Sequence, residues 1–207
     1  MRTLLVLCAF LATAPPARAA VPAPTNCSVP SVVRIVGWNG VAPDDALGSF
    51  TITVRDAVGA PVAGSLVLVD VAAIADVRLS AQQLDPQAVL SCPHRCVRKT
   101  TGADGTVRFT LVGRGAGPVG TPGPLLSNVY ADGVLIGRPR VVVFDLDGTG
   151  GIGANDVSLW LADYGSGLCP GRSDYNGDGV LSANDLSLWR WALGEGGSSV
   201  SPTLVCP

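Results

Sequence analysis

The sequence has few charged residues and no excess of basic ones, and these shortages exclude several classes of protein. Charged side chains make up 14% of the 207 residues and the formal net charge is −2, so no basic field attracts nucleic acid. No segment after the N-terminal region reaches about 18 uninterrupted apolar residues, the length of a membrane-spanning helix. Histidine occurs once, and no motif pairs it with a nucleophile. We therefore expect no nucleic-acid binding, no membrane span, no small-molecule substrate and no catalysis.

Glycine and proline are abundant instead, with 26 and 16 residues, and they separate short apolar segments. Segments such as Phe50–Arg55 and Val107–Leu111 alternate apolar and polar residues, which is typical of strands with one buried face. We expect strands at Ser31–Val36, Ser49–Arg55, Ser65–Val71, Thr106–Val112, Val129–Ile136 and Arg140–Phe144. Two sheets of such strands can bury their apolar faces together, so residues 31–143 are predicted to form a β-sandwich.

Residues 1–20 have the features of a secretory signal peptide, and residues 21–30 form a leader. Arg2 gives a basic start, Leu4–Ala14 is apolar, and Ala17-Arg18-Ala19 places small residues around a cleavage site. We therefore expect the protein to be secreted or displayed at the cell surface.

Export permits disulfide bonds, and five cysteines remain after cleavage of the signal peptide. An odd number means that at least one thiol is free or pairs with another molecule. We expect a Cys92–Cys96 bridge or a bridge from Cys27 to one of these two, and a Cys169–Cys206 bridge near the C-terminus.

Two turn motifs in the β region follow a known pattern. Thr53–Gly64 (TVRDAVGAPVAG) reads as a strand followed by D-x-x-G-x-P-V-x-G, and Thr101–Val107 (TGADGTV) contains T-x-x-D-G-x-V. In these motifs the region resembles bacterial Ig-like domains of the invasin type. The resemblance implies an Ig-like sandwich for residues 31–143. The segment Leu79–Arg98 departs from the family pattern and is predicted to be an inserted loop.

The C-terminal part of the chain contains an internal repeat. Asp145–Gly165 aligns with Asp174–Gly194 at an offset of 29 residues without gaps, and ten of the 21 paired positions are identical. Each copy begins with a twelve-residue segment of the EF-hand kind, named here loop 1 (Asp145–Asp156) and loop 2 (Asp174–Asp185).

Both loops place oxygen donors at alternating positions, as Ca²⁺ requires, and glycine at position 6 allows the sharp turn. In loop 2 the expected ligands are Asp174, Asn176, Asp178, the Val180 carbonyl, Ser182 and Asp185. In loop 1 they are Asp145, Asp147, Thr149, the Gly151 carbonyl and Asp156. We expect loop 1 to be the weaker calcium site, because Thr149 offers only a neutral hydroxyl at position 5.

A helix is predicted after each loop, at Asn155–Tyr164 and Asn184–Leu193, with Gly165 and Gly194 as the C-terminal caps. Apolar residues recur on one face of each helix at the spacing of helical turns. They are Val157, Trp160, Leu161 and Tyr164 in the first helix, and Leu186, Trp189 and Leu193 in the second.

A calcium loop followed by a helix, duplicated and closed by aspartate at position 12, resembles type I dockerin over about residues 144–196. The resemblance implies a small all-α calcium-binding module at residues 144–207 that docks onto a cohesin-like partner. It also implies partner contacts at Ala154-Asn155 and Ala183-Asn184, which are identical in the two copies and would permit two docking orientations. Arg190 and Trp191, on the second helix, are further candidates for partner contacts, and the alternative for Trp191 is that it covers the neighbouring end of the chain.

The sequence thus predicts an exported, non-catalytic protein, with an Ig-like β-sandwich followed by a dockerin-like module that mediates docking. The alternative is a structural surface protein in which calcium only stabilises the tail. A carbohydrate-binding sandwich is disfavoured, because the chain has only three tyrosines and four tryptophans.

Overall fold

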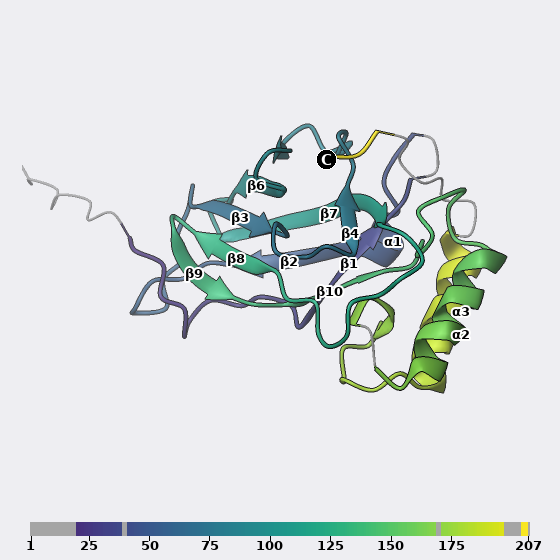
Figure 1. Ribbon diagram of the computed structural model, residues 1–207. Helices are drawn as coiled ribbons and strands as arrows, with labels where there is room; N and C mark the ends of the chain where they lie inside the picture. Colours follow the sequence, from purple (N-terminus) through teal and green to yellow (C-terminus); the bar gives the residue numbers. More distant parts are fainter. Residues whose placement is uncertain (1–19, 39–40, 169–170, 197–203, 207) are drawn as a thin grey trace, which may run out of the picture.

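The computed structural model describes residues 20–38, 41–168, 171–196 and 204–206, and it contains two β-sheets that share one apolar core (Figure 1). Sheet 1 has the strand order β10 (Arg140–Val143), β1 (Val32–Val36), β7 (Thr106–Gly115) and β2 (Ser49–Thr53), and β4 (Val77–Leu79) also pairs with β7. Sheet 2 has the order β5 (Val89–Ser91), β6 (Cys96–Thr100), β3 (Leu66–Asp70), β8 (Asn128–Ala131) and β9 (Val134–Gly137).

The two sheets differ in strand direction but bury residues in the same way. In sheet 1, β1 pairs in parallel with both β10 and β7, whereas the described pairings of sheet 2 are antiparallel. Alternate residues of β1 (Val33, Ile35) and of β3 (Val67, Val69) are at most 1% exposed. Each sheet therefore presents one apolar face to the common core, and the chain is mainly β.

The segment Leu79–Arg98 is not the inserted loop that the sequence predicted. It contains β5 and the start of β6, and β6 pairs with β3 over five residues. Val97 is fully buried, and Lys99 two residues later is 9% exposed because its ammonium contacts the carboxylate of Asp85 at 2.7 Å. A lysine in a buried strand position conceals the alternation of apolar and polar residues in β6, and this explains why that strand was missed.

The predicted strand Val129–Ile136 is a hairpin of two strands, β8 and β9. Its turn lies at Asp132 and Gly133, whose φ angles are 47° and 82°. Two successive residues with positive φ form the two-residue turn that joins tightly paired antiparallel strands.

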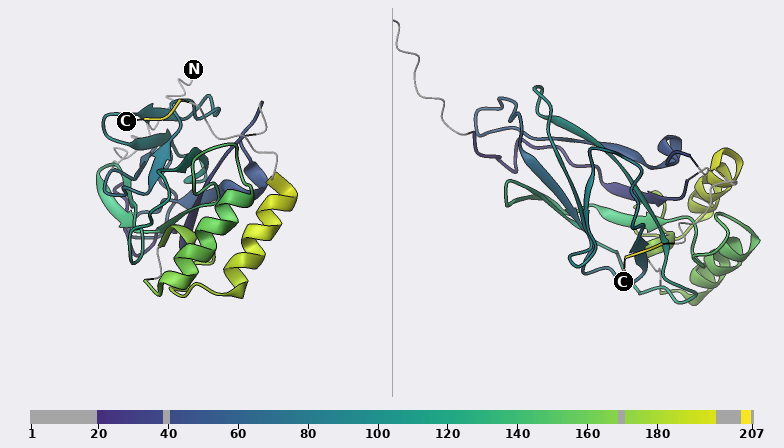
Figure 2. Two further views of the ribbon diagram at one scale, coloured as in Figure 1. Left: turned by 45° about the vertical axis from the view of Figure 1, so that its right-hand side comes forward. Right: turned by 90° about the horizontal axis from the view of Figure 1, so that it is seen from above.

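The prediction that a small all-α module follows the sandwich is wrong. The described residues contain three α-helices, α1 (Asp45–Gly48), α2 (Ala154–Ser166) and α3 (Ala183–Gly196), and a 3-10 turn, η1 (Gly171–Ser173). Helices α2 and α3 lie side by side at one end of the sandwich, and η1 contacts β10 (Figure 1, Figure 2). The tail is therefore a helix pair attached to sheet 1 rather than a module with its own core.

Buried contacts explain why the tail does not stand apart. The ring of Tyr175, which is fully buried, stacks on Phe144 at the end of β10 with 4.6 Å between ring centroids. Arg172 is also fully buried, and its guanidinium donates to the carbonyls of Gly117 and Pro118, at 2.6 and 2.9 Å, in the segment after β7. Because a buried guanidinium needs several partners, the burial of Arg172 depends on the sandwich as well as on the tail.

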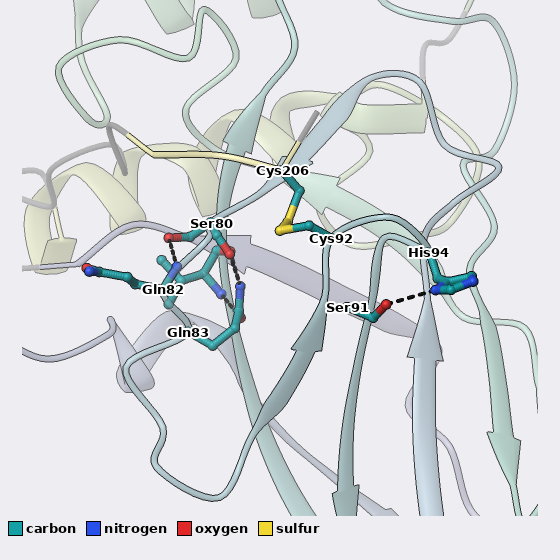
Figure 3. The surroundings of a disulfide bond; sticks show 8 residues. Ser80, Gln82, Gln83, Ser91, Cys92, His94 and Cys206 are labelled. Atoms are coloured by element: carbon teal, nitrogen blue, oxygen red, sulfur yellow. Dashed lines mark hydrogen bonds between the residues drawn. A yellow bond between two sulfur atoms is a disulfide. The ribbon is translucent and has the colours of Figure 1, made fainter.

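A disulfide bond joins the tail to sheet 2. Cys206 is bonded to Cys92, which lies in the turn between β5 and β6 (Figure 3). The backbone N–H of Cys206 also donates to the carbonyl of Leu79 at 2.8 Å. The two cysteines are 114 residues apart, and closing a chain of that length contributes about 4–5 kcal/mol in the chain-entropy model.

The predicted disulfide pairings are therefore wrong. Cys206 does not pair with Cys169, which lies outside the described residues, and Cys92 does not pair with Cys96 or Cys27. The thiols of Cys27 and Cys96 are free, and burial raises the pKa of Cys96. Pairing follows from which strands and chain ends meet in three dimensions, and sequence spacing does not contain that information.

Candidate calcium loops and helix pair

The sequence repeat corresponds to a repeat of hydrogen bonds. In loop 1 the closing Asp156 accepts from the N–H of Gly153 at 2.7 Å, and in loop 2 Asp185 accepts from that of Ser182 at 2.9 Å. Each closing aspartate also accepts from the N–H at position 3 of its loop, at 3.0 and 3.2 Å. Position 12 therefore holds each loop closed from within, whatever ion the loop binds.

Position 4 of each loop is a glycine that rests on sheet 1. Both Gly148 and Gly177 have a φ of 74°. A Cβ on Gly148 would lie 2.7 Å from the carbonyl oxygen of Gly115 in β7, and one on Gly177 would clash with Cγ2 of Val32 in β1. The sequence did not assign a role to these glycines. Their presence at position 4 of both repeats could have indicated that each loop packs closely against another part of the chain.

The three carboxylates of loop 1 lie close together. Asp145, Asp147 and Asp156 each offer an oxygen within 4.8 Å of the others, and Asp145 and Asp156 are 5% and 1% exposed. Thr149 turns back on the loop, because its N–H and its hydroxyl both donate to Oδ1 of Asp147, at 2.7 and 3.0 Å. Gly151 is buried at position 7. These hard oxygen donors fit Ca²⁺.

The electrostatics of loop 1 follow from this crowding. Burial, together with the negative charges of Asp156 and Asp147, raises the pKa of Asp145 to about 7. Burial also raises the pKa of Asp156, although hydrogen bonds from the backbone of Asp147 and Gly153 oppose the shift. A cation between these groups would reverse the effect, since it favours their charged forms.

Loop 2 arranges its acidic groups differently. Asp174 is 1% exposed, and its Oδ2 accepts from the N–H of Gly179 at 2.9 Å and from Nη1 of Arg140 at 2.7 Å. Its Oδ1 accepts from the N–H of Gly177 at 2.9 Å. Within the described residues, the loop 2 aspartates do not form a three-carboxylate group like that of loop 1. A strand residue thus supplies a cation to the first ligand position of this loop.

The remaining predicted ligands of loop 2 lie in the same turn. The amide of Asn176 donates to Oδ2 of Asp178 at 2.8 Å, and the N–H of Asp178 donates to Oδ1 of Asn176 at 2.9 Å. The hydroxyl of Ser182 donates to Asp185 at 3.2 Å, and Val180 is 61% exposed. The donor set is again oxygen and fits Ca²⁺, with Arg140 as the additional charged group.

The buried face of α2 differs from the predicted apolar stripe. Trp160 is 2% exposed, but Leu161 and Tyr164 are 53% and 55% exposed. The inward positions are instead Asp156, Trp160 and Asp163. Asp163 is inward because it forms an ion pair with buried Arg172, with 2.9 Å between Oδ2 and Nε. The sequence did not predict this ion pair. The feature that could have indicated it is that Arg172 is the single charged residue in the segment 166–173.

The helix ends also differ from the prediction. Gly165 lies inside α2, whose C-cap is Gly167 with a φ of 67°, and Gly194 lies inside α3. Left-handed backbone at Gly167 is the usual way in which a helix ends.

The predicted partner-binding residues lie on the outer surface of the helix pair. Ala154-Asn155 and Ala183-Asn184 are exposed in the first turns of α2 and α3, Arg190 is exposed, and Trp191 is 43% exposed. The end of α2 and the segment before α3 line one hollow of about 200 Å³, which includes Tyr164 and Val180. The helices are therefore antiparallel (Figure 2). Because each Ala-Asn pair begins its helix, the two pairs lie at opposite ends of the helix pair.

Comparisons with known proteins add little. No family model matches the chain, and no curated protein matches it. Among solved structures, it is weakly similar to the adhesin InvE of Yersinia pseudotuberculosis, with 16% identity and a TM-score of 0.27. That match covers 59% of this chain and spans 28% of the adhesin, and at this TM-score it carries no argument about function.

None of the helices in the described part of the chain has the length and apolarity needed to cross a membrane.

Proposed function

We propose that the protein binds Ca²⁺ through loop 1 and loop 2. The observation that carries this proposal is the carboxylate group of loop 1, where three aspartates converge within 4.8 Å and two of them are nearly inaccessible to water. Buried like charges repel each other, and a divalent cation removes that repulsion. The repeated hydrogen-bond frame of loop 2 supports a second site of the same kind.

The ligands would be those that the spacing of the loops predicts. In loop 1 they are Asp145, Asp147, Thr149, the Gly151 carbonyl and Asp156, and in loop 2 Asp174, Asn176, Asp178, the Val180 carbonyl, Ser182 and Asp185. Since the ion binds the folded state, it would stabilise the helix pair by an amount that rises with the logarithm of the free Ca²⁺ concentration once that concentration exceeds the dissociation constant.

Titration calorimetry of the mature chain tests calcium binding. The wild type is expected to bind Ca²⁺ at two sites, and the double variant Asp147→Asn/Asp174→Asn is expected to bind each ion at least about tenfold more weakly, because one ligand charge is lost per loop. Asp104→Asn, in an exposed turn of the sandwich, is the matched control and should bind like the wild type. Unchanged affinity in the double variant would refute the proposal.

Export is the second part of the proposed function. The N-terminal sequence has the features of a signal peptide, and the Cys92–Cys206 bond suits an oxidising compartment. We place the protein outside the cell or on its surface.

A non-catalytic docking role is the third part. The loop–helix repeats resemble type I dockerins, and the residues that the resemblance assigns to the interface are exposed on α2 and α3. Trp191, a large apolar side chain at 43% exposure, suits the centre of a protein interface. The proposed partner is a cohesin-like protein.

One observation favours the alternative, that calcium only stabilises the tail. The helix pair is attached to the sandwich by Arg172 and by the Cys92–Cys206 bond, as expected for a structural element. The structural reading predicts calcium binding without a calcium-dependent partner.

A binding assay with cohesin-like modules from the same genome separates the two readings. If docking occurs in two orientations, Asn155→Arg or Asn184→Arg alone should leave capture nearly intact, and the two together should abolish it. Capture should also be lost in excess chelator. Absence of any calcium-dependent capture would leave the structural reading.

A further inference from the structure

Arg140 is the first residue of β10, and its side chain crosses from sheet 1 to loop 2. Nη1 lies 2.7 Å from Oδ2 of Asp174, and the side chains of the two residues are 31% and 2% exposed. Asp174 stands at position 1 of the loop, where a calcium loop supplies a carboxylate to the ion. The guanidinium therefore holds a group that the proposed ion also needs.

The guanidinium also lies against position 6 of the loop. A Cβ on Gly179 would be 3.5 Å from Nη2 and 3.6 Å from Nη1 of Arg140. Gly179 in turn donates its N–H to the same Oδ2 of Asp174 that accepts from Arg140. Arg140, Gly179 and Asp174 also line one hollow at the edge of the loop. The positive charge thus lies beside the proposed ion site.

Loop 1 meets an arginine of sheet 1 in another way. Nη1 of Arg114, in β7, donates at 2.7 Å to the backbone carbonyl of Gly148. That carbonyl belongs to position 4 of the loop, which is not a ligand position. The two loops therefore differ in whether the neighbouring arginine bonds to the backbone or to a ligand carboxylate.

We propose that Arg140 and Ca²⁺ compete for Asp174, so that loop 2 exchanges an internal guanidinium for the ion. The inference rests on the calcium binding proposed above. Two cations that share one carboxylate repel each other, and the ion must displace Arg140 before it can take Oδ2. Loop 1, which its ligand residues alone would make the weaker site, then fills at lower calcium concentration than loop 2, and filling of loop 2 releases its tie to β10.

Calorimetry of the mature chain with loop 1 disabled tests the competition. In an Asp145→Asn/Asp147→Asn background, where loop 1 lacks two ligand charges, the remaining binding is that of loop 2, and adding Arg140→Gln is expected to tighten it about tenfold, because the competing charge is gone. Arg140→Lys keeps the charge and is expected to stay within about threefold of the parent. Arg138→Gln, at an exposed arginine two residues earlier, removes the same charge outside the loop and should have no effect.

The possible results separate failure of the proposed competition from failure of the proposed calcium binding. If wild-type protein binds Ca²⁺ but Arg140→Gln binds no more tightly than its parent, the competition is refuted and the proposed function stands. If Arg138→Gln tightens binding as much as Arg140→Gln, the effect is one of net charge and the inference is again refuted. If the wild type does not bind Ca²⁺, the proposed function and the inference fail together.

Thermal unfolding gives a second readout that does not require a measured affinity. In excess chelator, Arg140→Gln should unfold at a lower temperature than the wild type, because the tie between β10 and loop 2 is lost. Saturating Ca²⁺ should then raise its unfolding temperature by more than it raises that of the wild type. An equal or smaller rise would contradict the competition, even if the variant is less stable overall.

Discussion

Loop 1 and loop 2 have the same backbone frame but different electrostatic surroundings. In loop 1 three carboxylates converge and crowd one another, whereas in loop 2 the first carboxylate holds Arg140. The ligand residues alone predict a higher calcium affinity for loop 2 than for loop 1. The surroundings predict the opposite, because the guanidinium of Arg140 already neutralises a ligand carboxylate of loop 2. The affinity of a calcium loop therefore depends on the surface that carries it as well as on the ligands in its sequence.

The largest expected effect on stability comes from a position at which the two repeats differ. The first repeat has Asp163 there, and the second has Ala192. Asp163→Ala would make the first repeat like the second, but it would leave Arg172 buried without its carboxylate. We expect a loss of about 3–5 kcal/mol in the free energy of unfolding, measured by urea denaturation in excess chelator.

The double variant Asp163→Ala/Arg172→Met is the control for this prediction. It removes both charges, and it should recover most of the stability, since replacing a buried ion pair by apolar groups is often neutral. A loss below about 1 kcal/mol for Asp163→Ala alone would mean that the pair does not attach the helices to the sandwich.

A smaller difference is expected between the glycines at position 4. Alanine is strained at a φ of 74° in both loops, but at Gly148 it meets a backbone oxygen of Gly115, whereas at Gly177 it meets the side chain of Val32. Because a side chain can rotate away, we expect Gly148→Ala to cost about 3 kcal/mol and Gly177→Ala about 1–2 kcal/mol in chelator. Equal losses would show that the two loops rest on sheet 1 in the same way.

The smallest expected effect concerns the two equivalent tryptophans. Nε1 of Trp160 donates to the carbonyl of Ser173 at 3.2 Å, while Nε1 of Trp189 has no hydrogen-bond partner among the described residues. Trp160→Phe should therefore cost about 1 kcal/mol more than Trp189→Phe, as measured by urea denaturation. A greater cost at Trp189 would indicate a buried water or ion at its ring nitrogen.

Sequence reasoning predicted those parts of the structure that depend on local pattern. The offset of 29 residues located both loops and both helices, because a repeated loop requires the same glycines and aspartates each time. Most strands were located by their alternation of apolar and polar residues, as at the predicted strand Ser49–Arg55, which contains β2.

What sequence reasoning missed depends on contacts between distant segments. The side chain of Lys99 is buried because it forms an ion pair with Asp85. Cys206 forms a disulfide bond with Cys92, which is 114 residues earlier in the chain. Arg140 was assigned only as the start of a strand, and Arg172 was given no role. Each of these residues has its role because two separate parts of the chain meet, and neither part alone reveals it.

The disulfide also determines how a mechanical load would run through the molecule. The chain from β10 to Cys206 contains both loops and both helices, and its two ends are anchored by the pairing of β10 with β1 and by the bond to Cys92. A pull on the backbone at Cys206 passes through the sulfur atoms into the β5–β6 turn and leaves the helices unstretched. If the two helices separate, both ends of this segment stay attached to the sandwich. The helices can then pack together again quickly, because the loop-closure entropy is small.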